Sequence, residues 1–232
     1  MTPLNPNDNP PSLDQIATQL ASPSSRDRVL AMIELQKDTV SAEAASPLIQ
    51  KALRDEAVQV RGMATFYLGI KPTPRSLNQL VQILTDDPDY NVRSMAAGAL
   101  GYLEDKQALE ALRHAFYEDT SWLVQFSAAI ALGNLQVPQA KAVLLDALES
   151  ETVLLQEAAI MALGEIGAVD QVERLLTFVS AEDWMMRKRL AEALGNLPCA
   201  QSKSALAYLQ NDDNTVVAEA ASLALKQLTE LP

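Results

Sequence analysis

The sequence repeats every 31 or 32 residues, and this period limits the fold more than any other feature. Six segments align on a shared leucine, and their end residues are Gly69, Gly101, Gly133, Gly164, Gly195 and Lys226. Repeats of this length are typical of solenoids built from stacked helix pairs, in which each pair contacts only its neighbours. We therefore expect an all-α, right-handed α-solenoid (a superhelix) of about seven helical hairpins.

The second helix of each pair, called here the B helix, carries a clear apolar pattern. Apolar residues stand nine, five and one positions before the aligned end residue, and offsets of four place them on one helical face. This face is expected to form the core. Its members are Val60, Ala64, Leu68, Val92, Ala96, Leu100, Val124, Ala128, Leu132, Leu155, Ala159, Leu163, Met186, Leu190, Leu194, Val217, Ala221 and Leu225.

Glycine and proline predict where these helices end and begin. Five of the eight glycines stand at the aligned end position, where we expect a left-handed conformation that closes each B helix. Pro47 after Ser46 and Pro74 after Thr73 predict capped starts of the first helices of two pairs, called here A helices. The A helices are expected at 47–53, 74–84, 106–117, 139–148, 169–180 and 201–210, with a degenerate first pair at 13–21 and 26–36.

The N-terminal stretch differs from the rest of the chain. Residues 1–12 hold four prolines and almost nothing apolar, which predicts a disordered tail before a single solenoid domain over 13–232. The stretch has neither the basic region nor the apolar region of a secretory signal.

Charge and cysteine content restrict the partners and the compartment. The net charge of −12 disfavours nucleic acid and anionic membrane surfaces, because both are bound through lysine and arginine. No apolar run approaches the ~18 residues of a membrane span. Cys199 is the one cysteine, which excludes an internal disulfide and fits a reducing cytoplasm.

The residues that carry most enzyme chemistry are missing. One histidine, His114, and one cysteine cannot build a zinc site or a di-iron site. Phosphate-binding GxxxxGK and nucleophile-elbow G-x-S-x-G motifs do not occur. Cys199 has no evident basic partner, which favours an inert thiol. We expect no catalytic residue, no metal and no chemistry of its own.

Acidic residues recur at every turn from an A helix to a B helix. They are expected to cap the following helix, and they can also form an acidic ridge that attracts a basic partner. Arg28, Arg61 and Arg93 stand at equivalent positions in adjacent repeats. We expect these arginines to reach the acids of the neighbouring turn as a structural ladder.

Aromatic residues give the strongest hint of a binding site. Tyr90, Trp122 and Trp184 share one repeat position at the start of a B helix, and Phe126 follows one turn after Trp122. The B helices are expected to line the concave face. Together with Met63, Phe66, Met95, Ile130 and Met161 the aromatics predict an apolar stripe there. The alternative is ordinary packing over the ends of adjacent helices, which we favour for the methionines.

The pattern of an acid, a Val-Arg pair, alanines and Ala-Leu-Gly resembles the HEAT repeat. It is seen in DPDYNVRSMAAGALGYL at 87–103 and in DEAVQVRGMATFYLGI at 55–70. The short period is similar to that of the phycobilisome-lyase-type HEAT repeat, over roughly residues 25–230. The arginine becomes glutamine or alanine at Gln125, Gln156 and Ala218, so the chain departs from the pattern there.

The resemblance implies two functions. The first is a cytoplasmic scaffold or adaptor that binds a protein partner in its concave groove. The alternative is a bilin lyase or phycobilisome-turnover factor, whose partner is a phycobiliprotein or a second HEAT-repeat subunit. In that case the cofactor-like ligand is a bilin, with its body on Trp122 and Trp184 and its propionates on Arg187 or Arg189.

Overall fold

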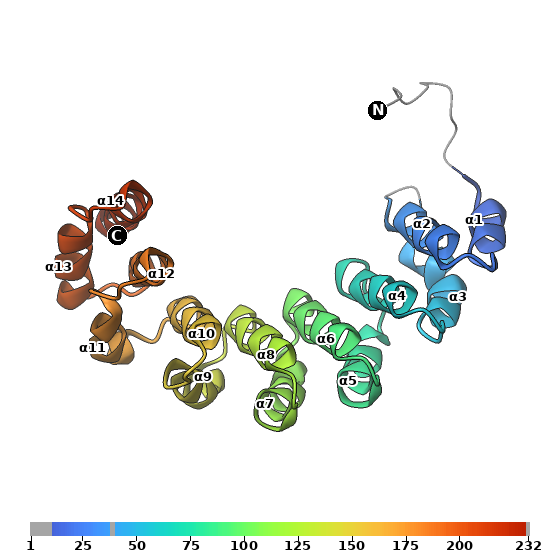
Figure 1. Ribbon diagram of the computed structural model, residues 1–232, viewed down its shortest axis with the longest axis horizontal. Helices are drawn as coiled ribbons and strands as arrows, with labels where there is room; N and C mark the ends of the chain where they lie inside the picture. The colour runs from blue at the N-terminus through green and yellow to red at the C-terminus, as the bar shows by residue number, and fades with distance from the viewer. Residues whose placement is uncertain (1–10, 38–39, 231–232) are drawn as a thin grey trace, which may run out of the picture.

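The computed structural model describes residues 11–37 and 40–230. All regular secondary structure in these ranges is helical, and its fourteen α-helices form seven consecutive pairs (Figure 1). The A helices are α1 (Leu13–Gln19), α3 (Ala42–Ala52), α5 (Ser76–Asp86), α7 (Leu109–Glu118), α9 (Lys141–Leu148), α11 (Val172–Leu175) and α13 (Ala200–Leu209). The B helices are α2 (Ser25–Gln36), α4 (Val58–Ile70), α6 (Tyr90–Leu103), α8 (Trp122–Asn134), α10 (Val153–Glu165), α12 (Trp184–Gly195) and α14 (Thr215–Glu230). The expected α-solenoid of seven helix pairs is confirmed.

The pairs follow one another along an open arc (Figure 1). The B helices α4, α6, α8 and α10 form its inner row, and α5, α7 and α9 form the outer row. The two ends of the arc turn toward the same side. The B helices therefore line the concave face, as the sequence predicts.

The core lies between the two rows and is formed by the predicted stripe. The valine, alanine and leucine positions of the B helices are buried, from Val60 to Ala221. Leu225 of α14 is only partly buried. At about 25 cal/mol per Å² of apolar surface, this continuous stripe is the main source of stability.

The repeated glycines do not close their helices, and that prediction is wrong. Each lies inside a B helix against an alanine of the next B helix. A Cβ added at Gly133 would lie 2.7 Å from Ala162 Cβ, and one at Gly164 would lie 2.8 Å from Ala193 Cα. Gly69, Gly101 and Gly195 meet Ala99, Ala131 and Ala224 in the same way. Glycine is required because a side chain would push neighbouring helices apart.

The left-handed residues stand three positions later in three of the repeats. Glu104 has φ 52°, Gln136 has φ 49° and Gly167 has φ 69°. Two of the three carry side chains, so composition does not reveal them. They turn the chain from a B helix toward the next A helix.

Two A helices begin at other residues than the prolines indicate. α3 begins at Ala42, because the Ser41 hydroxyl accepts a hydrogen bond from the Ala44 backbone N–H. Pro47 therefore lies inside this helix, and the early start buries Ala45. α5 begins at Ser76, two residues after Pro74.

The sixth A helix is interrupted. The predicted helix over 169–180 is instead a 3₁₀ turn at Val169–Gln171, the four-residue α11 and a second 3₁₀ turn at Leu176–Phe178. The Thr177 hydroxyl donates a hydrogen bond to the Arg174 carbonyl, and such local bonds compete with the α-helical ladder. The other predicted A helices form, with 3₁₀ starts at Lys106–Ala108 and Pro138–Ala140.

The N-terminal boundary lies slightly earlier than predicted. Ser12, assigned to the tail by composition, is the N-cap of α1, and its capping box with Gln15 is complete. Residues 1–10 of the predicted tail lie outside the described residues. In the described part of the chain, every helix is too short or too polar to cross a membrane.

The close contact between B helices predicts opposite effects for two glycine substitutions. Gly133→Ala should destabilise the fold by about 1–3 kcal/mol, the usual cost of overpacking, because the new methyl group meets Ala162. Gly98→Ala should stabilise it by about 0.5–1 kcal/mol, since nothing lies within 4 Å of the new Cβ. Urea unfolding measures both. Equal effects at the two sites would contradict the packing role.

Candidate functional site: the inner face and its acidic edge

A ladder of arginine–aspartate pairs joins consecutive repeats at the turns from A to B helices. Each arginine donates from Nε and Nη2 to both carboxylate oxygens of an aspartate one repeat later, with Nε–O distances between 2.6 and 2.9 Å. Its Nη1 donates to a backbone carbonyl six residues earlier. The pairs are Arg28–Asp55, Arg61–Asp87, Arg93–Asp119 and Arg187–Asp212. The predicted ladder is confirmed, with Arg187 as an additional member.

The aspartates also fix the turn that follows them. Asp55, Asp87, Asp119 and Asp212 each accept a hydrogen bond from the backbone N–H two residues later, at 2.8 to 2.9 Å. Both partners of each pair are largely buried. Bidentate pairs of this kind combine strength with a defined geometry.

The ladder is interrupted at two joints, and both partners change together. Between α8 and α10, Gln125 stands at the arginine position and Ser150 at the aspartate position. Between α10 and α12, Gln156 and Ala181 stand at these two positions. Gln125 keeps the bond to the carbonyl six residues earlier, at 2.9 Å from Asp119 O. Ser150 keeps the turn bond, at 3.1 Å from Thr152 N. At the joint between α8 and α10 the bonds within each repeat survive, and the bidentate pair between repeats is lost at both joints.

The arginine bonds change the acidity of the carboxylates. Hydrogen bonds from Arg187 lower the pKa of Asp212, against a smaller opposing effect of burial. At Asp119, burial raises the pKa, but the Arg93 and backbone hydrogen bonds outweigh it, so the pKa is lowered overall. These aspartates are charged at neutral pH.

Capping by the turn acids is confirmed for two B helices. Asp89 accepts from Asn91 N at the start of α6, and Asp183 accepts from Met185 N at the start of α12, both at 2.8 Å. α4, α8 and α10 have no side-chain cap. Capping therefore does not explain why the other turns are acidic. We call six of the turn acids outside the ladder the acidic edge: the two capping residues Asp89 and Asp183, together with Glu56, Glu118, Glu151 and Glu182.

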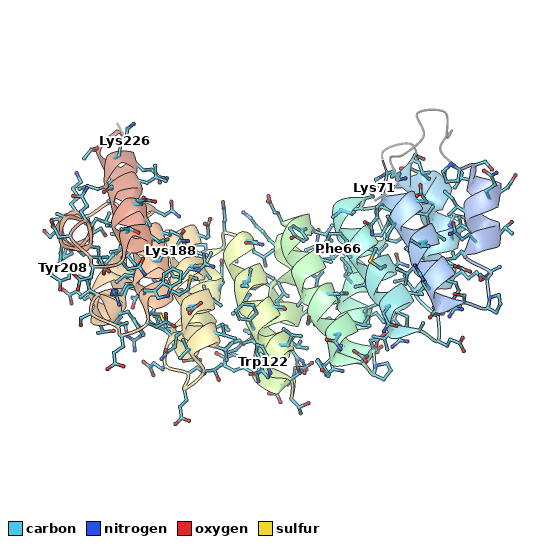
Figure 2. The ribbon with its side chains drawn as sticks, turned by 45° about the horizontal axis from the view of Figure 1, so that its top comes forward. Phe66, Lys71, Trp122, Lys188, Tyr208 and Lys226 are labelled. Atoms are coloured by element: carbon cyan, nitrogen blue, oxygen red, sulfur yellow. The ribbon has the colours of Figure 1, made fainter. Side chains whose placement is uncertain are left out.

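The predicted aromatic residues lie beside this edge. Tyr90, Trp122 and Trp184 are the first residues of α6, α8 and α12, and they are 49%, 51% and 39% exposed. Val153 holds the same place in α10 and is also exposed. Phe126 is partly buried and meets Trp122 edge to face, with ring centroids 6.5 Å apart. Figure 2 shows Trp122 at the lower end of its helix. We call Tyr90, Trp122, Val153 and Trp184 the edge row.

Arg187 and Arg189, the two arginines of the predicted site, differ in how accessible they are to a ligand carboxylate. Arg187 belongs to the ladder, where its guanidinium is occupied by Asp212 and two carbonyl oxygens. Arg189 is partly exposed and pairs with Glu192, which also pairs with Lys188. A ligand carboxylate would compete with Asp212 at Arg187 and with Glu192 at Arg189.

The middle of the inner face is an exposed apolar surface, which we call the inner floor. It consists of Ile70, Met95, Tyr102, Ile130 and Met161, all exposed, and the partly buried Phe66. Phe66 of α4 and Tyr102 of α6 meet edge to face across the two helices, at 6.2 Å. The sequence predicts an apolar stripe here that includes Phe66 and Ile130. Met95 and Met161, for which the sequence favours packing, are instead exposed. Ile70 and Tyr102, which follow the repeated glycines, were not predicted.

The inner floor is also free of unpaired charge. The only charged residues of α4, α6 and α8 are Arg61 and Arg93, and both belong to the ladder. Charged side chains appear beyond them, with Glu157 on α10 and the Lys188–Glu192–Arg189 group on α12. Partial burial, together with nearby Asp183, raises the pKa of Glu157. In a chain of net charge −12, three consecutive uncharged helix faces form a distinct surface.

The single histidine and cysteine are not part of this surface. His114 is exposed on α7, in the outer row. Cys199 is the N-cap of α13, where its sulfur accepts from Ser202 N at 3.4 Å. Within residues 11–37 and 40–230, no group of three His, Cys, Asp or Glu side chains is arranged to hold a metal ion.

These features define a class of protein: an α-solenoid of stacked helix pairs. A sequence model described as HEAT repeats matches residues 77–156 and 143–226, which together cover more than half of the chain. The chain belongs to the HEAT-repeat family. Among curated protein sequences, none matches it.

Solved structures with similar folds cover nearly the whole chain. The complex of CpcE and CpcF of phycocyanin lyase from Nostoc sp. PCC7120 matches with a TM-score of 0.62 at 22% identity, covering 98% of this chain and 99% of that one. The YibA protein of Escherichia coli matches with a TM-score of 0.61 at 17% identity, covering 93% of each chain. A Kap121p mutant matches with a TM-score of 0.66 at 16% identity, covering 94% of this chain and 27% of that one. At these identities the likeness establishes the fold.

Completing the ladder should stabilise the chain. Gln125→Arg together with Ser150→Asp creates the missing pair between α8 and the next repeat, in the geometry of Arg93 and Asp119. We expect a gain of about 1 kcal/mol in the free energy of unfolding, because the bidentate geometry is strong but burial of the two charges offsets part of their attraction. Gln125→Arg alone should give no gain. A single variant as stable as the double variant would contradict this explanation of the gap.

The ladder also predicts loss of stability in acid. A carboxylate with a lowered folded-state pKa stabilises the fold above its unfolded pKa, about 3.9 for aspartate, and this contribution disappears as pH falls through the folded value. Asp212→Asn should therefore be less stable than wild type at pH 7, and the difference should shrink as the pH falls below about 4. Urea unfolding across this range measures it. A constant difference would contradict the ionic role of Asp212.

Proposed function

We propose that this chain is a non-catalytic scaffold or adaptor that binds a protein partner on its concave inner face. The observation that carries this proposal is the inner floor. Large exposed apolar patches are rare on proteins that act alone, and a surface rich in aromatic residues and methionine is typical of protein-binding sites. The shape supports the same conclusion, because solenoids present extended concave surfaces to their partners.

The electrostatic pattern narrows the partner. The turns beside the edge row are acidic, which favours a basic protein surface and disfavours nucleic acid and anionic membranes. The single cysteine fits a reducing cytoplasm. The partner is therefore a cytoplasmic protein, and a second HEAT-repeat subunit is one such candidate.

The alternative function is bilin transfer or removal on a phycobiliprotein. Its support is the fold similarity to the phycocyanin lyase complex and the pair Trp122 and Trp184, whose rings are exposed on one edge. The occupied state of Arg187 counts against a propionate at that residue. Titration of the protein into a solution of phycocyanobilin tests this alternative. Unchanged bilin absorbance would overturn it.

The scaffold function is tested by affinity capture with matched variants. Proteins recovered from the source cell lysate with wild type should be lost with Met95→Gln/Ile130→Gln, because these changes make the inner floor polar. Tyr208→Gln alters an exposed aromatic on α13 of the outer row and should leave recovery unchanged. Recovery is quantified by mass spectrometry.

A second variant locates the contact more closely. Trp122→Ala/Trp184→Ala removes the two tryptophans of the edge row while keeping the inner floor. Loss of the partner with this variant as well extends the site to the edge. Equal recovery with wild type and both inner-face variants would overturn binding on the inner face. Unchanged urea unfolding midpoints show that the variants are folded.

A further inference from the structure

The inner floor, the edge row and the acidic edge lie in a fixed order across each B helix. The floor residues Ile70, Met95, Tyr102 and Ile130 are in the middle and at the C-terminal ends of α4, α6 and α8. The edge row stands at the N-terminal ends, and the acidic edge follows in the turns just before them. A partner on the inner face therefore contacts apolar surface in the middle, aromatic rings toward the N-terminal ends of the B helices, and carboxylates along that one side only.

Part of the acidic edge carries charge that the fold itself does not use. Glu118 and Glu151 are exposed and have no ion pair among the described residues. Glu56 is far out in solvent and only weakly paired, at 3.4 Å from Arg28. Glu118 is the last residue of α7, where a negative charge is unfavourable for the helix dipole. A cation brought by a partner would relieve this repulsion.

The edge row suits cationic side chains for a second reason. Lysine and arginine bind to the faces of tryptophan and tyrosine rings, most strongly where the site is partly desolvated. Trp122 and Tyr90 are half exposed. Asp89 directly precedes Tyr90, and Glu118 stands four residues before Trp122. Rings and carboxylates together form a surface for a row of basic residues.

The spacing of the B helices matches a helix laid across them. Packed helices lie about 8–10 Å apart, and the glycine–alanine contacts bring these helices close together. A partner helix rises about 9–10.5 Å over six or seven residues, so its apolar face reaches one B helix after another. The floor runs from α4 to Met161 of α10 and so spans four B helices, with three intervals between them. At six or seven residues for each interval, a crossing helix needs roughly 18–21 residues.

We propose that the inner face binds an amphipathic α-helix with apolar residues on one face and lysine or arginine along one flank. The apolar face lies on Phe66, Tyr102 and Ile130, and the basic flank lies on the edge row and the acidic edge. The inference rests on the proposed function and adds the chemistry of the partner. Helix-in-groove recognition reads apolar anchors at i, i+3 or i+4 and i+7, and the one-sided charge sets the direction in which the helix lies.

The experiment uses three synthetic peptides of 21 residues. The first has leucine at the first and fourth positions of each heptad, lysine beside the leucines and alanine elsewhere. The second has glutamate in place of lysine. The third has the composition of the first, with the leucines distributed around the helix. Fluorescence anisotropy of labelled peptides measures binding to the full chain at 50 and 200 mM salt.

We expect the lysine peptide to bind at least tenfold more tightly than the other two. Met95→Gln/Ile130→Gln should weaken it at least tenfold, and Glu118→Gln/Glu151→Gln should weaken it about three- to tenfold and reduce its salt dependence. Glu43→Gln/Glu173→Gln removes two exposed charges from the outer row and should have a much smaller effect.

The outcomes separate this inference from the scaffold function. Equal binding of the lysine and glutamate peptides, both lost with the floor variant, would overturn the charge requirement and leave the inner face as a helix-binding surface. Binding of the lysine peptide that is insensitive to the floor variant would reveal charge attraction alone and overturn the inference. Failure of all three peptides would also overturn it, while a partner captured by the inner floor would still support the scaffold function.

Discussion

The contact of glycine on alanine between successive B helices determines the shape on which the rest depends. Five joints use it, and each leaves no room for a further methyl group. The A helices contain no glycine, so they do not make this contact with one another. A row that is closer on one side must curve toward that side, so the concave face follows from the smallest side chains in the chain. At the first joint the equivalent positions hold Gln36 and Tyr67, and α14 has Lys226 in place of the glycine.

Much of the fold is predictable because its period is local. The stripe through Val92, Ala96 and Leu100 identifies α6 without knowledge of its neighbours, and the equivalent stripe identifies each of the other aligned B helices. The role of Gly101 is not local, because a glycine near a helix end is equally compatible with a left-handed turn and with close packing. Only the position of Ala131 in the next helix distinguishes them. The left-handed turn itself falls on Glu104, a residue type that gives no signal for it.

The candidate site was predictable in part for the same reason. A shared repeat position identifies Tyr90, Trp122 and Trp184, and helical offsets place Ile130 and Met161 on the inner side. Tyr102 could not be assigned to the floor, because its exposure depends on where α6 ends and on Phe66 of the preceding repeat. Arg187 is a residue that the sequence assigns to the site and the structure assigns to the ladder. The sequence predicts that it binds a ligand carboxylate, but the neighbouring repeat supplies the carboxylate of Asp212, so Arg187 has a structural role.

The gaps in the ladder have a mechanical consequence. A solenoid bends at its joints, and the stiffness of each joint depends on the bonds that cross it. Three consecutive joints from α2 to α8 carry a bidentate pair, as does the joint between α12 and α14, whereas the two joints around α10 carry none. Other bonds cross these two joints in the outer row: Tyr117 donates to Asp146, and Lys141 and Arg174 pair with Asp170 and Glu149. These bonds are exposed, whereas the ladder pairs are largely buried. We therefore expect the arc to widen or narrow most easily at the two joints around α10.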